Sequence, residues 1–576
     1  LEKLVGGFLV GNFISGIALM VIPLLVGFSS EGSIWIVFFI ETACIGITCI
    51  KKRRTFRISL SPFEIVLTLV LIAIAYYLME KSFSYSNGSF RIASNLYQDF
   101  GAHIPFIRSF SLGQNIPPVM PFFSNHPLTY HFLFDFLIGI YERAGIPLIY
   151  AFNIVSTLAL TSLLLFVFSL SKILFGENPW IGLVAITLTL TNSTTSFIEA
   201  FQKYGFHVGN YYHNTTYLGD GPFGQSIVSI FWNLNTYLNQ RHFLFAVAIS
   251  LFITICIVRT RGILVPLGSR IALGIMIGLL PFWNSPIYLI TLGMCIGIII
   301  QMKRTHWMSY IPVLIPAILL AIPQVLYIGS HTGQSVIVSP GFLARESFPA
   351  WLFYWVRNFG VSILTMPLGV YVAKKESRVL VLPILALFVA ANTFQLASQM
   401  FDNHKLFNVM IICMNLYSSY LIVWLYKKSI VMKSIACIFL FFLTISGVLD
   451  IFVVKNDVKT VVTDYPSNAF MSWVLKNTKS DAVFVTNGDI YDPVTIVGRK
   501  TLTGRPHLAF LYGIDTQTDF ARRDKLLAGS ESARDIYIAL YSSSDTPTQT
   551  VKTDHEQLRK MYRMIYTDHS VVVYSK

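Results

Sequence analysis

The sequence predicts a polytopic α-helical membrane protein that ends in a small α/β domain. Of its 576 residues, 54% are apolar and only 12% are charged, and the mean hydropathy is +0.61. Because charged residues make up roughly a quarter of an ordinary soluble chain, this composition excludes the soluble class. The apolar residues form stretches near the roughly 20 residues that cross a bilayer core, which indicates transmembrane helices.

About thirteen membrane spans follow from these stretches. Pro281 and Pro286 separate two of the shorter ones, and because proline removes a helical hydrogen bond we expect two helical legs to meet there. The first stretch lacks a small-residue cleavage pattern, so we expect a retained helix. The expected spans are residues 4 to 28, 32 to 50, 62 to 80, 147 to 171, 179 to 198, 308 to 328, 351 to 373, 379 to 397, 406 to 426 and 434 to 454, with shorter ones at 243 to 258, 271 to 281 and 287 to 302.

Basic residues in the short loops between spans predict the orientation. Positively charged loops stay in the cytoplasm, so we expect a multi-pass protein of the cell membrane with a cytoplasmic N-terminus and an extracytoplasmic C-terminal domain. These loops also explain much of the net charge of +14, so we expect no nucleic-acid partner. The basic groups are Lys51 to Arg54, Arg259 with Arg261, Lys303 with Arg304, Lys374 and Lys375 with Arg378, and Lys427 with Lys428.

The chain is expected to divide into a membrane domain, residues 1 to 454, and a soluble extracytoplasmic domain, residues 455 to 576. Three outer loops are too long to be turns, and loops of that length are usually functional. Residues 128 to 141 are too short to span, so we expect an interfacial helix there. The three loops comprise residues 82 to 145, 199 to 242 and 329 to 350. The soluble domain should contain a helix at residues 467 to 479 and strands at residues 482 to 486, 536 to 540 and 571 to 574.

Asp99 is the most informative polar residue of the first long loop. Pro105 lacks the N–H that an interior helical position needs, so we expect a helix to begin about one turn earlier, with Asp99 at its start. A carboxylate there is favoured by the helix dipole alone. On a helical wheel, however, Asp99 lies close to His103, Phe106 and Phe110, so it would be partly desolvated and able to accept a proton. The structural and the catalytic interpretation both remain open.

The first loop resembles that of GT-C glycosyltransferases, which include the protein O-mannosyltransferase and lipid A aminoarabinose transferase groups. In both, an acidic residue follows a transmembrane helix, and a short amphipathic helix and a Pro-Leu-x-Tyr element precede the next span. Many relatives have an acidic pair where this chain has Gln98 before a single acidic residue. The matching positions are Asp99, Pro127, Leu128, Tyr130 and Gly145, with further similarity at residues 274 to 281 and 402 to 405.

The resemblance implies a GT-C-like membrane domain that transfers a sugar, with inversion, from a polyprenyl-phosphate donor to a lipid, glycan or protein acceptor at the outer face. Asp99 occupies the place of the catalytic acidic residue, with His103 beside it. The departing phosphate then needs cations. The candidates are Arg241, Arg345, Arg357 and Lys405. For Arg241 and Lys405, snorkelling to the membrane interface is an equally open interpretation.

Several aromatic and polar residues of the outer loops suit sugar binding, although a membrane-interface belt has the same composition. A divalent metal held by His207, His213 and Asp220 is a further alternative, although their spacing matches no established ligand pattern. No other cofactor is expected. The candidates for substrate binding are Tyr130, His207, His213, Asp220, Asp402 and His404.

Two other classes of function remain open from the sequence. The broken hairpin at residues 271 to 302 and the charge of Arg357 inside an expected span are typical of transporters of lipid-linked or soluble solutes. A non-catalytic membrane scaffold could also present the C-terminal domain. Long outer loops rich in ionisable and aromatic residues favour the transferase over both alternatives.

Overall fold

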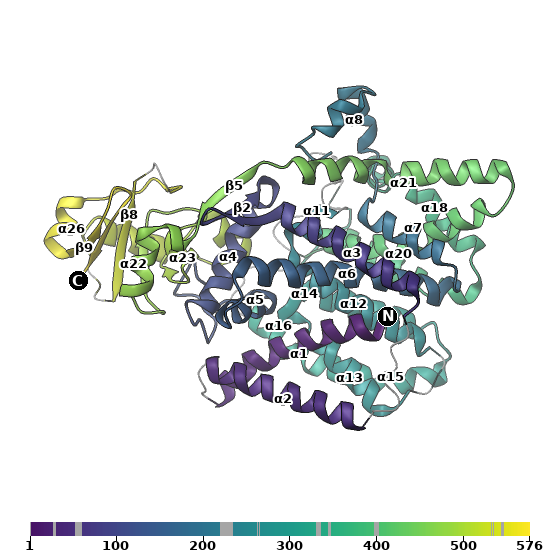
Figure 1. Ribbon diagram of the computed structural model, residues 1–576, viewed down its shortest axis with the longest axis horizontal. Helices are drawn as coiled ribbons and strands as arrows, with labels where there is room; N and C mark the ends of the chain where they lie inside the picture. Colours follow the sequence, from purple (N-terminus) through teal and green to yellow (C-terminus); the bar gives the residue numbers. More distant parts are fainter. Residues whose placement is uncertain are drawn as a thin grey trace.

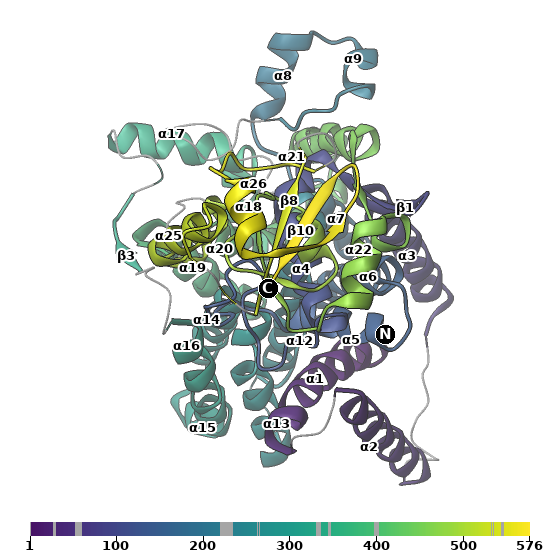
Figure 2. The same ribbon diagram turned by 90° about the vertical axis from the view of Figure 1, so that its left-hand side faces the viewer.

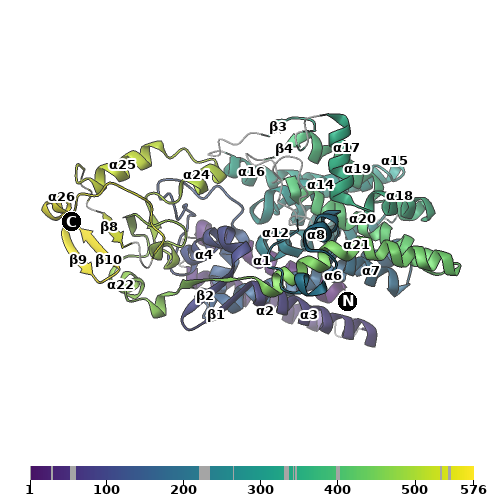
Figure 3. The same ribbon diagram turned by 90° about the horizontal axis from the view of Figure 1, so that it is seen from above.

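The protein is a bundle of helices with a mixed α/β domain at one end (Figures 1 and 3). Nine helices in the described part of the chain are long and apolar enough to cross a membrane, which supports the membrane class. The computed structural model describes residues 2–26, 30–51, 60–218, 234–261, 263, 265–329, 336–341, 343, 347–396, 403–531, 533, 535–542 and 546–576.

Helices α6, α12 and α20 form the centre of the bundle, because they are buried over nearly their whole length. Helix α12 packs against α6 and α14, and α20 packs against α7, α18 and α21. The long apolar helices are α1 (Glu2–Val26), α3 (Pro62–Ser82), α6 (Leu148–Phe175), α12 (Arg241–Arg259), α14 (Pro281–Ile299), α15 (Arg304–Leu319) continued by α16 (Ala321–Gly329), α19 (Val381–Thr393), α20 (His404–Tyr426) and α21 (Ile430–Asn456). Further helices are α2 (Ser30–Lys51), α7 (Pro179–Leu190), α13 (Leu267–Gly278), α17 (Phe348–Phe359) and α18 (Ser362–Val372).

Not every expected span is one continuous helix: residues 179 to 198 divide into α7, which ends at Leu190, and α8 (Ser196–Tyr204). Residues 351 to 373 are not one helix, because α17 ends at Gly360, whose φ of 51° lies in the left-handed region that favours glycine. Helix α13 ends before Pro281, and Asn284 within α14 has extended backbone angles. The break expected near the two prolines is therefore confirmed, whereas the expected count of thirteen full spans is not established.

The first long loop contains more secondary structure than the sequence indicated. Helix α4 begins two turns before Pro105, so Asp99 lies inside its first turn and not at its entrance. Helix α5 is buried by protein from Leu133 to Ile140 and packs on α4 and α6, which contradicts a helix lying along the membrane surface. The elements are β1 (Phe83–Ser86), β2 (Ser89–Ala93), η1 (Ser94–Leu96), α4 (Tyr97–Ser111) and α5 (Leu133–Arg143).

The second long loop projects from the flank of the bundle. Its helices α8 (Ser196–Tyr204) and α9 (Val208–Tyr212) lie beside α21 and away from the C-terminal domain (Figure 2). The short helix α11 (Leu234–Asn239) then leads into α12. Strands β3 (Ile337–Val338) and β4 (Phe394–Gln395) pair beside α17 and α19.

The C-terminal domain has a five-stranded sheet in the order β7-β6-β8-β10-β9. Strand β6 pairs in parallel with β7 and β8, and β10 pairs antiparallel with β8 and β9. The expected helix and all three expected strands are confirmed as α22, β6, β8 and β10. The elements are α22 (Ala469–Asn477), β6 (Val483–Thr486), α23 (Pro493–Ile496), β7 (Lys500–Thr501), α24 (Pro506–Tyr512), α25 (Gln517–Leu527), β8 (Ile536–Tyr541), α26 (His555–Met561), β9 (Arg563–Thr567) and β10 (Val571–Ser575).

The C-terminal domain is anchored to the first long loop along several segments. Strand β5 (Lys459–Thr463), which follows α21, pairs antiparallel with β2, so the two regions share the sheet β1-β2-β5. The Thr501 backbone N–H donates to the Pro121 carbonyl at 2.8 Å, and the His126 ring contacts Asp519 at 2.7 Å. These contacts fix the domain above α4 and α5.

The burial of Lys459 in β5 leads to a prediction about the stability of the protein. Burial lowers its pKa to about 8 from an ordinary 10.5, only partly offset by Asp457, and its Nζ makes no hydrogen bond within the described residues. A lysine whose pKa is lowered on folding destabilises the folded state at any pH below that lowered pKa. This destabilisation disappears as the pH rises from the folded-state pKa to the unfolded-state pKa. We therefore expect Lys459→Met to be more stable than the parent at pH 7 by about 1 kcal/mol, after allowance for solvent screening.

The measurement is thermal unfolding of both proteins in detergent. The advantage of Lys459→Met should shrink between pH 8 and 10.5, because the parent gains stability there as its lysine becomes neutral. A difference that stays constant over this range would contradict the assignment.

Candidate functional site

Three buried histidines meet beneath the C-terminal domain. His103 comes from α4, His131 from the segment before α5, and His242 from the first turn of α12. The ring of His242 lies 4.8 Å from that of His103 and 4.8 Å from that of His131, measured between centroids. Polar side chains are rarely gathered in a protein interior without a structural or chemical role. These three histidines therefore mark the centre of the candidate site.

A carboxylate in α5 completes this histidine cluster, by which we mean His103, His131, His242 and Asp135. The Nδ1 atom of His103 lies 2.9 Å from Oδ2 of Asp135, and both side chains are buried. The second carboxylate oxygen of Asp135, Nε2 of His131 and Nδ1 of His242 hydrogen-bond to no described residue. Buried polar atoms without partners are uncommon and mark sites of strain, catalysis or ligand contact.

The two histidines outside the membrane helices differ in their preference for a proton. Burial opposes a charge on His103, but Asp135 and then Asp99 outweigh it, so the pKa of His103 is raised. Burial lowers the pKa of His131 well below its usual value, and the positive charge of Lys405 lowers it further. The site therefore combines His103, which is easier to protonate than an ordinary histidine, with His131, which is harder to protonate.

Aromatic rings close the cluster toward the C-terminal domain. The ring of Tyr130 lies 3.7 Å from that of His131, and the ring of Tyr512 in α24 lies 5.1 Å from that of Tyr130. The Tyr130 hydroxyl lies 3.5 Å from Nε2 of His242. The C-terminal domain thus contributes a side chain, Tyr512, to the wall of the site.

Asp99 lies at the edge of this cluster and is half-buried. Its carboxylate accepts a hydrogen bond from the side-chain amide of Asn239 in α11. Its negative charge contributes to the raised pKa of His103 and, after burial and Tyr97, to the strongly raised pKa of Tyr491 in the C-terminal domain. Asp99 therefore lies between the buried histidines and the more open surface below that domain.

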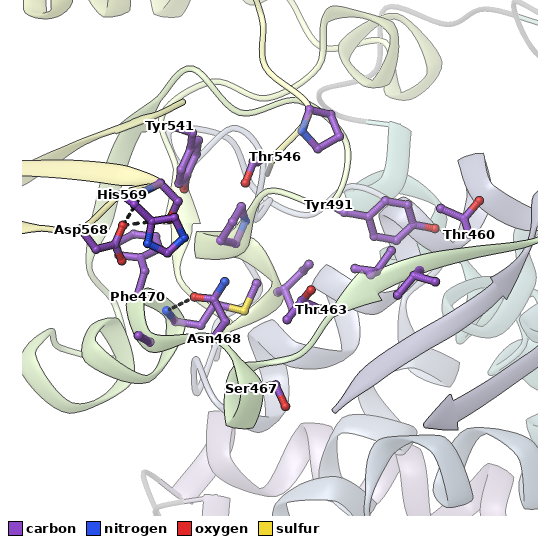
Figure 4. Close-up of a pocket in the computed structure, with 18 of the residues that line it drawn as sticks. Thr460, Thr463, Ser467, Asn468, Phe470, Tyr491, Tyr541, Thr546, Asp568 and His569 are labelled. Atoms are coloured by element: carbon purple, nitrogen blue, oxygen red, sulfur yellow. Dashed lines mark hydrogen bonds between the residues drawn. The ribbon is translucent and has the colours of Figure 1, made fainter. Parts of the chain in front are cut away.

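A polar cavity of about 580 Å³ lies at this junction of the first loop and the C-terminal domain. Tyr97, two residues before Asp99, forms part of its wall. Figure 4 shows Phe470 and His569 at one end of the cavity, and Tyr491 and Thr460 at the other. Aromatic faces beside hydroxyl and amide groups can stack on and hydrogen-bond to a sugar ring.

Arg241 has a structural environment. Its guanidinium is fully buried and donates to the Asn153 side chain at 2.6 Å, to the Ser82 hydroxyl at 2.9 Å and to the carbonyl oxygens of Met79 and Leu238. It also lies 4.5 Å from the centre of the Phe152 ring. With Nε, Nη1 and Nη2 all engaged inside the protein, Arg241 joins α3, α6 and α12 and is not positioned to bind a phosphate or to snorkel.

Helix α20 begins with His404 and Lys405, close to the histidine cluster, and both side chains are buried. Asn403 fixes the start of this helix, since its amide donates to the Ala391 carbonyl at 2.8 Å and to the Phe394 carbonyl at 2.6 Å. The ammonium of Lys405 is near enough to His131 to affect its pKa. A lysine at a helix N-terminus presents a cation together with free backbone N–H groups.

The other predicted site residues do not join this group. Arg357 ends α17 and pairs with Glu199 of α8. His207 and His213 flank α9 on the projection beside α21. In the part of the chain that the structure describes, no group of three or more His, Cys, Asp or Glu side chains, the histidine cluster included, has an arrangement that could hold a metal ion. The predictions for Asp220, Arg345 and Asp402 lie outside the described residues.

The sequence predicted five site residues that the structure places around one centre. They are Asp99, His103, Tyr130, His404 and Lys405. His131, Asp135 and His242 were not predicted as members of that centre. The available signal was their position next to residues already singled out, since His131 follows Tyr130 and His242 follows Arg241. Neither a comparison with protein-family models nor one with curated proteins finds a match to this chain.

Proposed function

We propose that this protein is a GT-C-like membrane glycosyltransferase that moves a sugar from a polyprenyl-phosphate donor to an acceptor hydroxyl at the outer face of the membrane. The observation that carries the proposal is the convergence of Asp99, the histidine cluster and Lys405 at one end of the membrane helices, under a rigid C-terminal domain. A carboxylate, a proton-holding imidazole and a cation are the groups that such a transfer requires.

Asp99 acts as the general base in this scheme. It takes the proton of the acceptor hydroxyl while the acceptor oxygen bonds to the anomeric carbon of the donor. The bond from that carbon to the phosphate oxygen breaks, and the phosphate leaves with the electron pair, so the configuration at carbon inverts. Asn239 orients the carboxylate, and His103 in its protonated form is close enough to stabilise the negative charge of Asp99.

Lys405 receives the departing phosphate, because all three guanidinium nitrogens of Arg241 are bonded inside the protein and Arg357 lies elsewhere. The polar cavity beside Tyr97 offers an acceptor sugar or small glycan a place next to Asp99. An acceptor bound there would touch both the first loop and the C-terminal domain. This accounts for the extensive contacts between the two.

The proposal is tested by release of polyprenyl phosphate. Purified protein in detergent is incubated with a panel of hexosyl and pentosyl polyprenyl phosphates and with simple glycoside acceptors, and the lipid product is separated and quantified. We expect release from at least one donor above the rate without protein. Uptake of a donor into sealed vesicles without any release of polyprenyl phosphate would support a transporter instead.

Replacing Lys405 tests the assignment of the cation. Lys405→Gln removes the charge but keeps a polar side chain of similar length, and we expect donor turnover to fall by about tenfold to a hundredfold, the range for a lost charge-assisted hydrogen bond. Arg357→Gln serves as the matched control, because this cation is bound to Glu199 away from the site. Equal losses in the two variants would contradict the role of Lys405.

A further inference from the structure

A second polar region lies at the end of the bundle opposite the C-terminal domain (Figures 1 and 3). A surface cavity of about 930 Å³ opens there between the segments that follow α12, α14 and α18. Three of the long apolar helices, α12, α14 and α15, begin or end within a few residues of it. The cavity therefore lies where the chain leaves the apolar part of the bundle, far from the histidine cluster.

This cavity is strongly cationic. Four cationic side chains line it against the single carboxylate of Glu376, which leaves a net formal charge of +3; the cations are Arg261, Lys303, Lys375 and Arg378. Among the residues that the structure describes, no carboxylate lies within salt-bridge distance of any of the four. Two further cavities in the described part of the chain differ from it: the lining of the one beside Tyr97 includes one Asp and one His, and the one beside Trp351 has no ionisable residue in its lining.

The two arginines are held in fixed positions. The guanidinium of Arg378 donates to the carbonyl oxygens of Tyr371 and Ala373, both at 2.9 Å, and that of Arg261 donates to the Glu376 carbonyl at 2.8 Å. Lys303 and Lys375 are exposed at the rim. The fixed guanidiniums set a positive potential inside the cavity, and the lysines can close over an anion that enters it.

An apolar wall distinguishes this cavity from a simple anion site. Val370, Val381, Leu382 and Leu385 line it beside the cations, and Leu385 on α19 has 54% of its surface exposed. Such residues on a bundle that spans a membrane face acyl chains. A soluble phosphate would use the cations and leave this wall uncovered, whereas an anionic phospholipid would use both.

We propose that this cavity binds the head group of an anionic phospholipid, with its phosphate among Arg261, Lys303, Lys375 and Arg378 and its acyl chains along α19. Basic pockets between transmembrane helices recognise such head groups in this way. The bound phosphate would offset part of the net charge of +3 at the point where α12, α14, α18 and α19 meet. This site is independent of the proposed transfer reaction.

The test titrates the full chain in neutral detergent with short-chain phosphatidylglycerol, phosphatidylcholine of the same chain length, and inorganic phosphate, and counts bound molecules by native mass spectrometry. We expect phosphatidylglycerol to bind at least tenfold more tightly than either of the others. The double variant Lys303→Gln, Lys375→Gln should lower this affinity about tenfold or more, at roughly 1 kcal/mol for each lysine.

Lys427→Gln with Lys428→Gln is the matched control, because it removes two exposed lysines from another loop at the same end of the bundle. This control should bind phosphatidylglycerol like the parent. The double variant Lys303→Arg, Lys375→Arg should also bind like the parent, because it keeps both positive charges. Added salt should weaken phosphatidylglycerol binding to the parent chain and leave phosphatidylcholine binding unchanged. Equal binding of the two lipids, equal binding of inorganic phosphate, or an equal loss in the control would each overturn the proposal.

Discussion

Asp99→Asn should lower the transfer rate by two or more orders of magnitude while leaving the amount of folded protein in the membrane nearly unchanged. A general base contributes about 10²–10⁴-fold to a reaction rate, and an amide has the shape of the carboxylate but cannot take its proton. The fold should tolerate the change. The introduced amide could still hydrogen-bond to Asn239, and asparagine is accepted near a helix start almost as well as aspartate.

Asp457→Asn is the control that separates catalysis from helix positioning. Asp457 accepts hydrogen bonds from Ser94 and Asn95 immediately before α4, so it holds the same helix start without touching the histidine cluster. We expect this variant to be slightly less stable and to transfer within a few-fold of the parent. Near-normal transfer by Asp99→Asn would refute the base assignment, and loss of folded protein would indicate a structural role.

The sequence predicted those parts of the fold that depend on local pattern. Apolar stretches of sufficient length became helices, and the short runs of β-branched and aromatic residues around Val483, Ile536 and Val571 became strands. The pairing of Phe90 in β2 with Val462 in β5 could not be predicted, because more than 360 residues separate them and neither strand shows where its partner lies. The interruption at Gly360 was missed because hydropathy does not register a single backbone conformation.

In the candidate site, too, contacts between residues close in the sequence could be predicted, whereas contacts between distant segments could not. Asp99 and His103 lie one helical turn apart, so their proximity follows from spacing alone. His242 comes near His103 only because α12 packs beneath α4, which no local pattern reveals. Among the sequence-based candidates for the phosphate cation, Arg241 had snorkelling to the interface as an equally open alternative, since a charge buried in an apolar region is costly. Its partners on α3 and α6 meet that cost inside the protein.

Arg108→Met should destabilise the protein by about 3 to 5 kcal/mol, the usual cost of removing one member of a buried ion pair. Arg108 is 2% exposed and lies between two carboxylates, with Nε 3.1 Å from Glu142 in α5 and Nη2 3.1 Å from Asp464 beyond β5. Its guanidinium also stacks on Tyr465 at 5.1 Å. The substitution would leave two negative groups facing each other in the interior, at the contact that joins the first loop to the C-terminal domain.

Unfolding by guanidinium chloride, followed through the intrinsic tryptophan fluorescence of the whole chain, measures this effect. Burial already raises the pKa of Glu142, and without Arg108 that pKa should rise further, so the variant should recover stability as the pH falls from 8 toward 5. Glu142→Gln with Asp464→Asn in the Arg108→Met background should recover part of the loss at neutral pH. Arg522→Met is the matched control, because the ion pair of Arg522 with Glu531 lies at the surface, with side chains 41% and 35% exposed, and its loss should change stability by no more than about 0.5 kcal/mol. A loss for Arg108→Met no larger than this control would show that the pair is not what holds the domain in place.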